Sequence, residues 1–231
     1  MSDLLFRDRV DAGRRLAAVL APFEGAHPLV LALPRGGVPV AFEIARELQA
    51  DLDLLFVRKL GAPGHEEFGI GAVVDGAHPQ VVLNEMIVRA LRLEQRYIDA
   101  ELARQLREIE RRRSAYMGNR ASQPIGGRTV IVVDDGIATG STMLAALQGI
   151  RRNHPAQLVL AVPLAPTEAL RELRPWCDEI VCLAAPEPFH AVGLHYADFA
   201  QTSDAEVVRL LAQARNWRHA ADTSKRRKAQ R

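Results

Sequence analysis

The sequence predicts an α/β fold in which a central, mainly parallel sheet is flanked by helices. Three stretches support this prediction, and in each a short apolar run is followed by a loop and then by a helical pattern: 29–49, 128–151 and 157–173. Strands that alternate with helices in this way usually form parallel sheets joined by right-handed crossovers. We therefore expect ligands to bind where the strands end, at the carboxyl edge of the sheet.

Length and composition indicate one globular domain over residues 1–222, and one domain with an appended subdomain is the alternative. A chain of 231 residues that is 48% hydrophobic can bury a full core. Apolar stretches such as 158–165 are too short to cross a membrane, and charges near the N-terminus leave no apolar signal region, so we expect a cytoplasmic protein. Cys177 and Cys182 lack a metal-ligand pattern and are expected to be reduced packing thiols.

Charge is unevenly distributed along the chain. Residues 223–231, TSKRRKAQR, hold five Lys or Arg and no acid, so the rest carries 25 basic and 28 acidic residues, a balance of −3. The basic character therefore belongs to this tail, which we expect to be disordered and solvated. A nucleic-acid role for the tail is the alternative, and composition favours the solvated end.

The first part of the chain predicts a helix, a strand and a second helix. Apolar residues within 4–21 are spaced for one helical face. A short apolar strand over 29–33 leads into the loop PRGG, residues 34–37, and a helix is expected over 38–49. Paired glycines let backbone amides approach a ligand and Arg35 adds a charged fork, so the loop is a candidate anion site. Ordinary turn glycines are the alternative.

The next stretch predicts a strand that ends in two cations. Residues 53–57 form the strand, and Arg58 and Lys59 stand at its carboxyl end, where they could bind anionic oxygens. Solvated charges are the alternative. Residues 61–69 are expected to form a mobile polar loop that belongs to a lid. Two short strands within 70–83 then predict a hairpin.

Residues 84–116 predict one long helix, because no Pro or Gly interrupts them. Its apolar side is expected to consist of Ile87, Leu91, Ile98, Leu102, Leu106 and Ile109. The charged residues between them, including Glu101 and the run 110–113, are expected to stay solvated. The basic residues at the end of this run lack an accompanying aromatic series, which favours a solvated helix end over a nucleic-acid site.

Residues 128–142, RTVIVVDDGIATGST, are the stretch around which the chain is organised. An apolar strand over 130–133 is followed by two adjacent carboxylates, Asp134 and Asp135, and by a loop over 136–142 rich in hydroxyl and backbone N–H donors. A loop that opens a helix behind a strand aims amide N–H groups at one point and makes an anion site. The alternative is an ordinary junction in which these residues only cap the helix, but a cap needs one hydroxyl and this loop has three. The spacing matches neither a nucleoside triphosphate loop nor a dinucleotide fingerprint.

The last third of the chain extends the sheet. Three elements are expected, namely a strand over 157–162, a helix over 167–173 and a strand over 179–183. Residues 185–202 form a loop rich in aromatics, in which Phe189 and Tyr196 either stack on a planar ring or pack a cap onto the sheet, and both alternatives stay open. A final helix is expected over 204–215, capped by Ser203 or Asp204.

The apolar strand, the acid pair and the TGST loop together resemble the 5-phosphoribosyl 1-diphosphate (PRPP) signature of the type I phosphoribosyltransferases. With PRGG, VRK and VGLHYADFAQT, the chain resembles along nearly its whole length a bacterial group of stand-alone phosphoribosyltransferases known from their sequences. The resemblance implies the type I phosphoribosyltransferase fold, with residues 84–118 as a helical insertion and 184–202 as a hood that recognises the acceptor. It implies a glycosyltransferase of nucleotide metabolism that moves the phosphoribosyl group from PRPP to a nitrogen acceptor and releases diphosphate.

The resemblance also implies roles for individual residues. The acid pair would hold the ribose hydroxyls, the loop after it the 5′-phosphate, and the PRGG loop the diphosphate, often through a non-proline cis peptide in this family. The implied PRPP site comprises Arg35, Gly36, Gly37, Arg58, Lys59, Asp134, Asp135, Ala138, Thr139, Gly140, Ser141 and Thr142. Four of these are also the implied catalytic residues: Arg35, Lys59, Asp134 and Asp135. The implied acceptor contacts are Phe189 and Tyr196.

Cofactor and partners follow from the same resemblance. Mg²⁺ is expected, held mainly by PRPP and water without a direct protein ligand. PRPP and a nitrogen acceptor are the expected partners, with no membrane or nucleic acid, and a homodimer stays open. Hypoxanthine-guanine enzymes carry an acid where this chain has Ala138, which disfavours a 6-oxopurine, whereas adenine and orotate enzymes share the alanine. The alternative function is a regulatory protein of the same fold that senses PRPP or nucleotides without turnover, with RNA binding as a variant.

Overall fold

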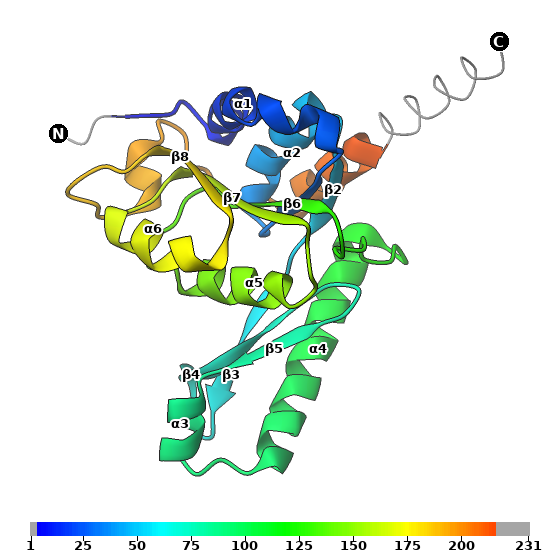
Figure 1. Ribbon diagram of the computed structural model, residues 1–231, viewed down its shortest axis with the longest axis vertical. Coiled ribbons are helices and arrows are strands. Elements are labelled where there is room, and N and C mark those ends of the chain that lie inside the picture. Colours follow the sequence, from blue (N-terminus) through cyan, green and yellow to red (C-terminus); the bar gives the residue numbers. More distant parts are fainter. Residues whose placement is uncertain (1–3, 216–231) are drawn as a thin grey trace.

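The computed structural model describes residues 4–215, and for residues 66 and 67 it describes the backbone alone. At its centre lies a fully parallel sheet with the strand order β2-β1-β6-β7-β8. The strands are β1 (Leu29–Ala32), β2 (Asp51–Leu54), β6 (Thr129–Val133), β7 (Gln157–Leu164) and β8 (Glu179–Ala184). Helices cover both faces of this sheet (Figure 1), which confirms the predicted fold class.

Each face of the sheet has its own set of helices. One face is covered by α1 (Arg9–Val19), α2 (Gly37–Glu47) and the helical residues 204–215. The other face is covered by α5 (Ser141–Arg151) and α6 (Thr167–Leu173). Alternate residues of β1 serve the two faces, because Val30 packs with the α2 side and Leu31 with the α5 side. Burial on both faces explains why β1 and β6 have nearly continuous apolar sequences.

The first helix is shorter than the predicted 4–21. Residues before it are extended and pair with the segment near residue 195: the Phe6 amide donates to the His195 carbonyl at 3.0 Å, and the Ala197 amide donates to the Phe6 carbonyl at 2.9 Å. The helix then begins behind Asp8, whose side chain accepts from the Asp11 amide at 2.7 Å as an N-cap. Backbone pairing with a distant segment therefore prevents these residues from continuing the helical pattern.

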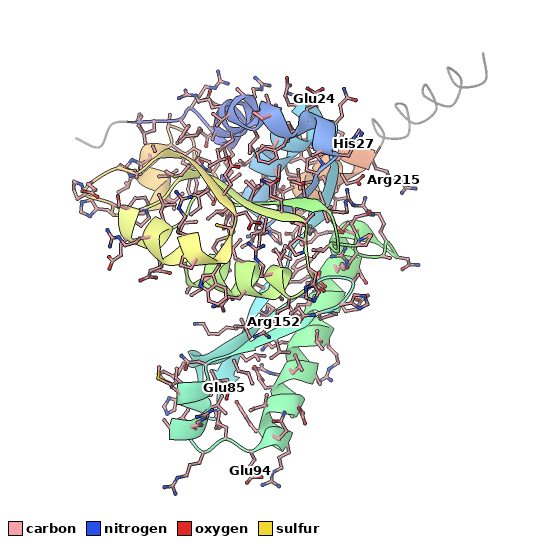
Figure 2. All side chains as sticks on the ribbon, viewed as in Figure 1. Glu24, His27, Glu85, Glu94, Arg152 and Arg215 are labelled. Atoms are coloured by element: carbon pink, nitrogen blue, oxygen red, sulfur yellow. The ribbon has the colours of Figure 1, made fainter. Side chains whose placement is uncertain are left out.

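Residues 57–117 form an arm that projects from the sheet-containing body (Figure 1). It consists of an antiparallel sheet of β3 (Val57–Ala62), β4 (His65–Val74) and β5 (Gln80–Leu83), with α3 (Glu85–Ala90) and α4 (Gln95–Met117). Glu94 lies at the far end of the arm, whereas Arg152 lies near its junction with the body, where it donates to the Val81 carbonyl (Figure 2).

Two predictions for the arm sheet were wrong and one is confirmed. The strand expected over 53–57 ends at Leu54, and Val57 begins β3 in a different sheet. The loop expected over 61–69 is largely the β3–β4 hairpin. Its glycines and polar residues suggested a loop, but an antiparallel strand pair can keep such residues on a solvated face. The hairpin expected within 70–83 is confirmed as β4 and β5.

The helix predicted over 84–116 is interrupted between α3 and α4. Arg92 has a left-handed conformation with φ of +50°. Its amide donates to the Arg89 carbonyl at 3.1 Å, and the Leu93 amide donates to the Val88 carbonyl at 3.1 Å, which is a Schellman C-cap. Because glycine usually occupies the left-handed position of this cap, the arginine gave no sequence signal for the break.

Arg113 of α4 is buried, although the run 110–113 was expected to be solvated. It is 5% exposed and donates to Asp53 at 2.8 and 3.0 Å and to Asp75 at 2.7 Å. Asp53 lies on β2 of the body and Asp75 follows β4 of the arm, so one guanidinium connects the two parts. Burial raises the pKa of Asp75, and the Arg113 charge opposes that rise. Glu101, also expected to be solvated, is 7% exposed and pairs with Arg104.

The remaining elements follow the predictions. α6 begins and ends where it was expected, and β7 and β8 extend the predicted strands by one or two residues. The final helix is capped by Ser203, whose hydroxyl accepts from the Glu206 amide at 3.1 Å. Cys177 and Cys182 are free thiols as predicted, and burial raises the pKa of Cys177 to about 11. Within residues 4–215, none of the helices has the length and apolarity that a membrane crossing requires. The predicted basic tail lies outside the described residues.

Replacing Arg113 tests the connection between arm and body. Arg113→Ala leaves two buried carboxylates without their cation, and we expect a loss of about 3–5 kcal/mol in the free energy of unfolding. Urea unfolding followed by circular dichroism measures this loss. The matched control is Arg112→Ala, because the neighbouring Arg112 side chain is 44% exposed and pairs at the surface with Glu108, so we expect no measurable loss for this variant. Equal effects of the two substitutions would contradict a structural role for the buried pair.

Candidate functional site

Two loops that are a hundred residues apart in the sequence touch at the carboxyl edge of the sheet. Loop 34–37 follows β1, the acid pair follows β6, and the two strands are neighbours with Ala32 opposite Val133. A Cβ atom at Gly36 would lie 2.0 Å from Oδ2 of Asp135, and one at Gly37 would lie 2.8 Å from the Val133 carbonyl oxygen. Only glycines permit this approach, so the predicted anion loop and the predicted acid pair form one site. The peptide bond between Pro34 and Arg35 is cis.

The acid pair lies in a partly closed environment. Oδ1 of Asp134 accepts from the Asp135 amide at 2.8 Å, and Oδ2 of Asp135 accepts from Nε of Arg9 at 2.7 Å. Burial and the neighbouring Asp135 carboxylate raise the pKa of Asp134 well above its usual range. The two acids therefore have different environments, because one is held by an arginine and the other is disfavoured as an anion.

Arg9 is a site residue that the sequence pattern did not reveal. It is the first residue of α1, and its Nη1 group also donates to the Ala200 carbonyl at 2.7 Å. Its guanidinium carbon lies 3.9 Å from the centre of the Phe199 ring. Residues 7–15 contain four arginines, which are typical of a solvated helix, so nothing in the pattern distinguished this one.

The hydroxyl-rich loop after the acid pair is exposed and opens α5. Ile137 is buried and anchors the loop, and its amide donates to the Leu164 carbonyl at 3.0 Å. Gly140 precedes α5 with φ of +80°, a conformation that favours glycine. The hydroxyls of Thr139 and Ser141 lie 3.4 Å apart on the exposed side. The predicted phosphate-binding residues 138–142 thus present donors at the start of a helix, where anions are stabilised.

The structure separates the two predicted cations Arg58 and Lys59. Both lie in β3, so their side chains point to opposite faces of the arm sheet. Lys59 lines a cavity of about 610 Å³ that it shares with Ser141 and Thr142 of α5. Nε of Arg58 donates instead to Oε1 of Gln105 on α4 at 3.0 Å. Lys59 therefore lies on the side of the hydroxyl-rich loop, whereas Arg58 faces away from it.

Arg35 is paired with an acid at the edge of the site. Its Nη1 group lies 3.2 Å from Oδ1 of Asp204, which also accepts from the Tyr116 hydroxyl at 2.7 Å. These two hydrogen bonds hold the pKa of Asp204 below its usual range. Tyr116 belongs to the last turn of α4, so the base of the arm, the last helix and loop 34–37 meet at this carboxylate.

The aromatic residues of segment 185–202 differ in their surroundings. Tyr196 is 4% exposed, lies 5.3 Å from the Phe6 ring and 5.0 Å from the Phe199 ring, and donates its hydroxyl to the Asp135 carbonyl at 2.6 Å. In the structure Tyr196 therefore packs within the segment that covers the sheet. Phe189 is partly buried beside His195, with ring centres 5.6 Å apart, and its contact with an acceptor stays a prediction.

Comparisons with known proteins show which proteins this chain is similar to. Residues 8–198 match the family model of the phosphoribosyl transferase domain. Two curated proteins of Mycobacterium tuberculosis, from strains CDC 1551 and H37Rv, are 48% identical over 211 residues, and their names assign them provisionally to the phosphoribosyl transferases. The alignment covers 91% of this chain but 47% of each relative, so the chain spans about half their length. The crystal structure of TT1426 from Thermus thermophilus is 44% identical, covers 90% of this chain and 98% of its own, and has a TM-score of 0.78.

Replacing Gly36 tests whether the two loops must touch. Gly36→Ala places a methyl group where the Asp135 carboxylate lies, and we expect a loss of about 2 kcal/mol in unfolding free energy. For a chain of this size the loss corresponds to a decrease of roughly 4–8 °C in Tm, measured by calorimetry. Gly126→Ala is the control, because its nearest contact would be an ordinary 3.5 Å. An unchanged Tm for Gly36→Ala would show that the loops do not need this contact.

Proposed function

Because the chain belongs to the phosphoribosyl transferase family, we propose that it transfers the 5-phosphoribosyl group from PRPP to a nitrogen acceptor and releases diphosphate. The observation that carries the proposal is the contact between loop 34–37 and the acid pair. It puts an arginine-bearing loop, two carboxylates and a hydroxyl-rich helix start at one sheet edge, which matches the diphosphate, the ribose and the 5′-phosphate of one substrate.

The sugar phosphate is held by the β6–α5 segment in this proposal. Backbone amides and hydroxyls of residues 138–142 bind the 5′-phosphate at the start of α5. Asp134 and Asp135 bind the ribose hydroxyls. Both carboxyl groups can accept hydrogen bonds from the ribose hydroxyls, and Asp135 does so beside the Arg9 cation. Fixing both ends of the sugar orients C1 toward the acceptor, which is the main requirement of such a transfer.

The leaving group is stabilised by cations and amides in this proposal. The bond between C1 and the diphosphate oxygen breaks with its electron pair on the oxygen, and the acceptor nitrogen supplies the pair for the new C1–N bond and then loses its proton. Arg35 and the amides of Gly36 and Gly37 bind the departing charge, and Lys59 approaches from the arm. In this proposal Arg35 exchanges Asp204 for phosphate oxygens when diphosphate binds. Arg58 has no part in this step because it faces α4.

Mg²⁺ is the cofactor we propose, and the residues at the sheet edge fit it. Carboxylate oxygens are the hard donors that this ion accepts, and Asp134 and Asp135 would hold it through water while PRPP supplies the remaining oxygens. When bound, the ion neutralises part of the diphosphate charge. The protein residues of the site then need to provide only positioning and the rest of the charge compensation.

Diphosphate release tests the proposed function. Purified protein with PRPP and Mg²⁺ is assayed against a panel of nucleobases and small amines. With the acceptor that supports release, we expect Asp135→Asn and Lys59→Ala to lower kcat/KM on the order of 100-fold, since each removes a group that acts on the reacting sugar or leaving group. Asp51→Asn is the control for the loss of one carboxylate, because Asp51 begins β2 at the opposite edge of the sheet and pairs with Arg128.

Two results would contradict this proposal. Full activity of Asp135→Asn would remove the acid pair from the mechanism. Tight PRPP binding without diphosphate release, whatever the acceptor, would instead indicate a protein that senses PRPP without turnover.

A further inference from the structure

Asp135 is held by residues from both ends of the chain. Its side chain accepts from Arg9, at the start of α1, and its backbone carbonyl accepts from the Tyr196 hydroxyl in the 185–202 segment. Neither residue belongs to the β6–α5 segment that supplies the acid. On its other side Asp135 faces Gly36, which has no side chain to restrain the carboxylate. The carboxylate of Asp135 is therefore held by Arg9 and its backbone by Tyr196, and both residues lie outside its own loop.

Arg9 is itself fixed by three different parts of its guanidinium group. Nε donates to Asp135, Nη1 donates to the Ala200 carbonyl, and the planar face lies over the Phe199 ring. The side chains of the ion pair are only 11% and 14% exposed, so water screens the pair weakly and a ligand in the site would not easily displace it. A surface arginine that merely occupied the site until a ligand arrived would be more exposed and less constrained.

The charge of Arg9 also reduces the electrostatic repulsion between the two adjacent acids. Asp134 and Asp135 repel each other when both are ionised, and this repulsion acts in a partly buried environment. Arg9 opposes the effect of Asp135 on Asp134. One guanidinium therefore both orients an acid and reduces the repulsion within the pair.

We propose that Arg9 is a positioning residue of the sugar-phosphate site, which holds the Asp135 carboxylate in the orientation that the ribose hydroxyls require. This inference rests on the proposed function. Because the same guanidinium binds Ala200 and Phe199, it also connects the acid pair to the segment predicted to contact the acceptor. Arg9 does not touch the substrate; it acts through Asp135.

Binding of ribose 5-phosphate, measured by calorimetry on the full chain, tests the role of Arg9. We expect Arg9→Ala to bind the sugar phosphate about tenfold more weakly and inorganic phosphate as tightly as the wild type, because loop 138–142 is unaltered. We expect the affinity of Arg9→Lys for ribose 5-phosphate to lie between those of the wild type and Arg9→Ala. An ammonium group can pair with Asp135 but cannot make all three contacts of the guanidinium. Arg14→Ala is the matched control: Arg14 also lies on α1 and pairs with a buried acid, Glu43, away from the site.

A double-mutant cycle shows whether Arg9 acts through Asp135. The variant with both Arg9→Ala and Asp135→Asn is expected to bind ribose 5-phosphate no more weakly than Asp135→Asn alone. Additive losses would overturn the positioning role, and so would unchanged or tighter binding by Arg9→Ala. Where Arg9→Ala does not fold, wild-type affinity in Arg9→Lys would overturn it equally. Failure of the wild type to bind ribose 5-phosphate would contradict the proposed function rather than this inference.

Discussion

The close approach of loop 34–37 to the acid pair is the constraint that shapes the whole site. Parallel pairing of β1 with β6 brings the two loops to the same edge of the sheet. Gly37 lets the two backbones touch, and Gly36 leaves room for the Asp135 carboxylate. With a side chain at Gly36, the carboxylate of Asp135 would have to leave its position. The acids, the arginine of the first loop and the start of α5 share one neighbourhood because this contact exists.

The elements whose signals lie within a few residues could be predicted from the sequence. The β6–α5 segment is marked by an apolar run, two acids and a small-residue loop, and both its place at the sheet edge and its neighbour, loop 34–37, were predicted. Errors arose where a distant partner decides the structure. The start of α1 is set by pairing with residues near 195, and the burial of Arg113 is set by two acids that are 38 and 60 positions away. Arg9 was missed for the same reason.

Local conformation caused the other errors. Arg92 adopts the left-handed conformation that ends α3, and a glycine at this position would have indicated the helix end in the sequence. The β3–β4 hairpin is polar and therefore resembles a loop in composition. The alternation of side chains along β3 also has a functional consequence, because it turns Lys59 toward α5 and Arg58 toward α4. Of the two adjacent cations, Lys59 therefore lines the cavity beside Ser141 and Thr142, and Arg58 pairs with Gln105.

Charge pairs join the arm, the body and the site. The buried Arg113 connects β2 to the end of β4, and Asp204 connects Arg35 to Tyr116 at the base of α4. The Arg113 ion pairs are largely shielded from water and stabilise the junction. The Arg35–Asp204 pair is exposed, so an anion that competes for Arg35 can replace Asp204. The arm is thus joined to the body by a buried ion pair, and Arg35 of loop 34–37 is held by an exposed one.

Recognition of a ribose phosphate by one sheet edge underlies every step proposed above, and a crystal structure with ribose 5-phosphate and Mg²⁺ would show it. We expect the phosphate among the amides and hydroxyls of residues 138–142, and the ribose hydroxyls within hydrogen-bond distance of Asp134 and Asp135. Density for the sugar phosphate elsewhere, or an edge that stays empty at saturating ligand, would contradict this recognition.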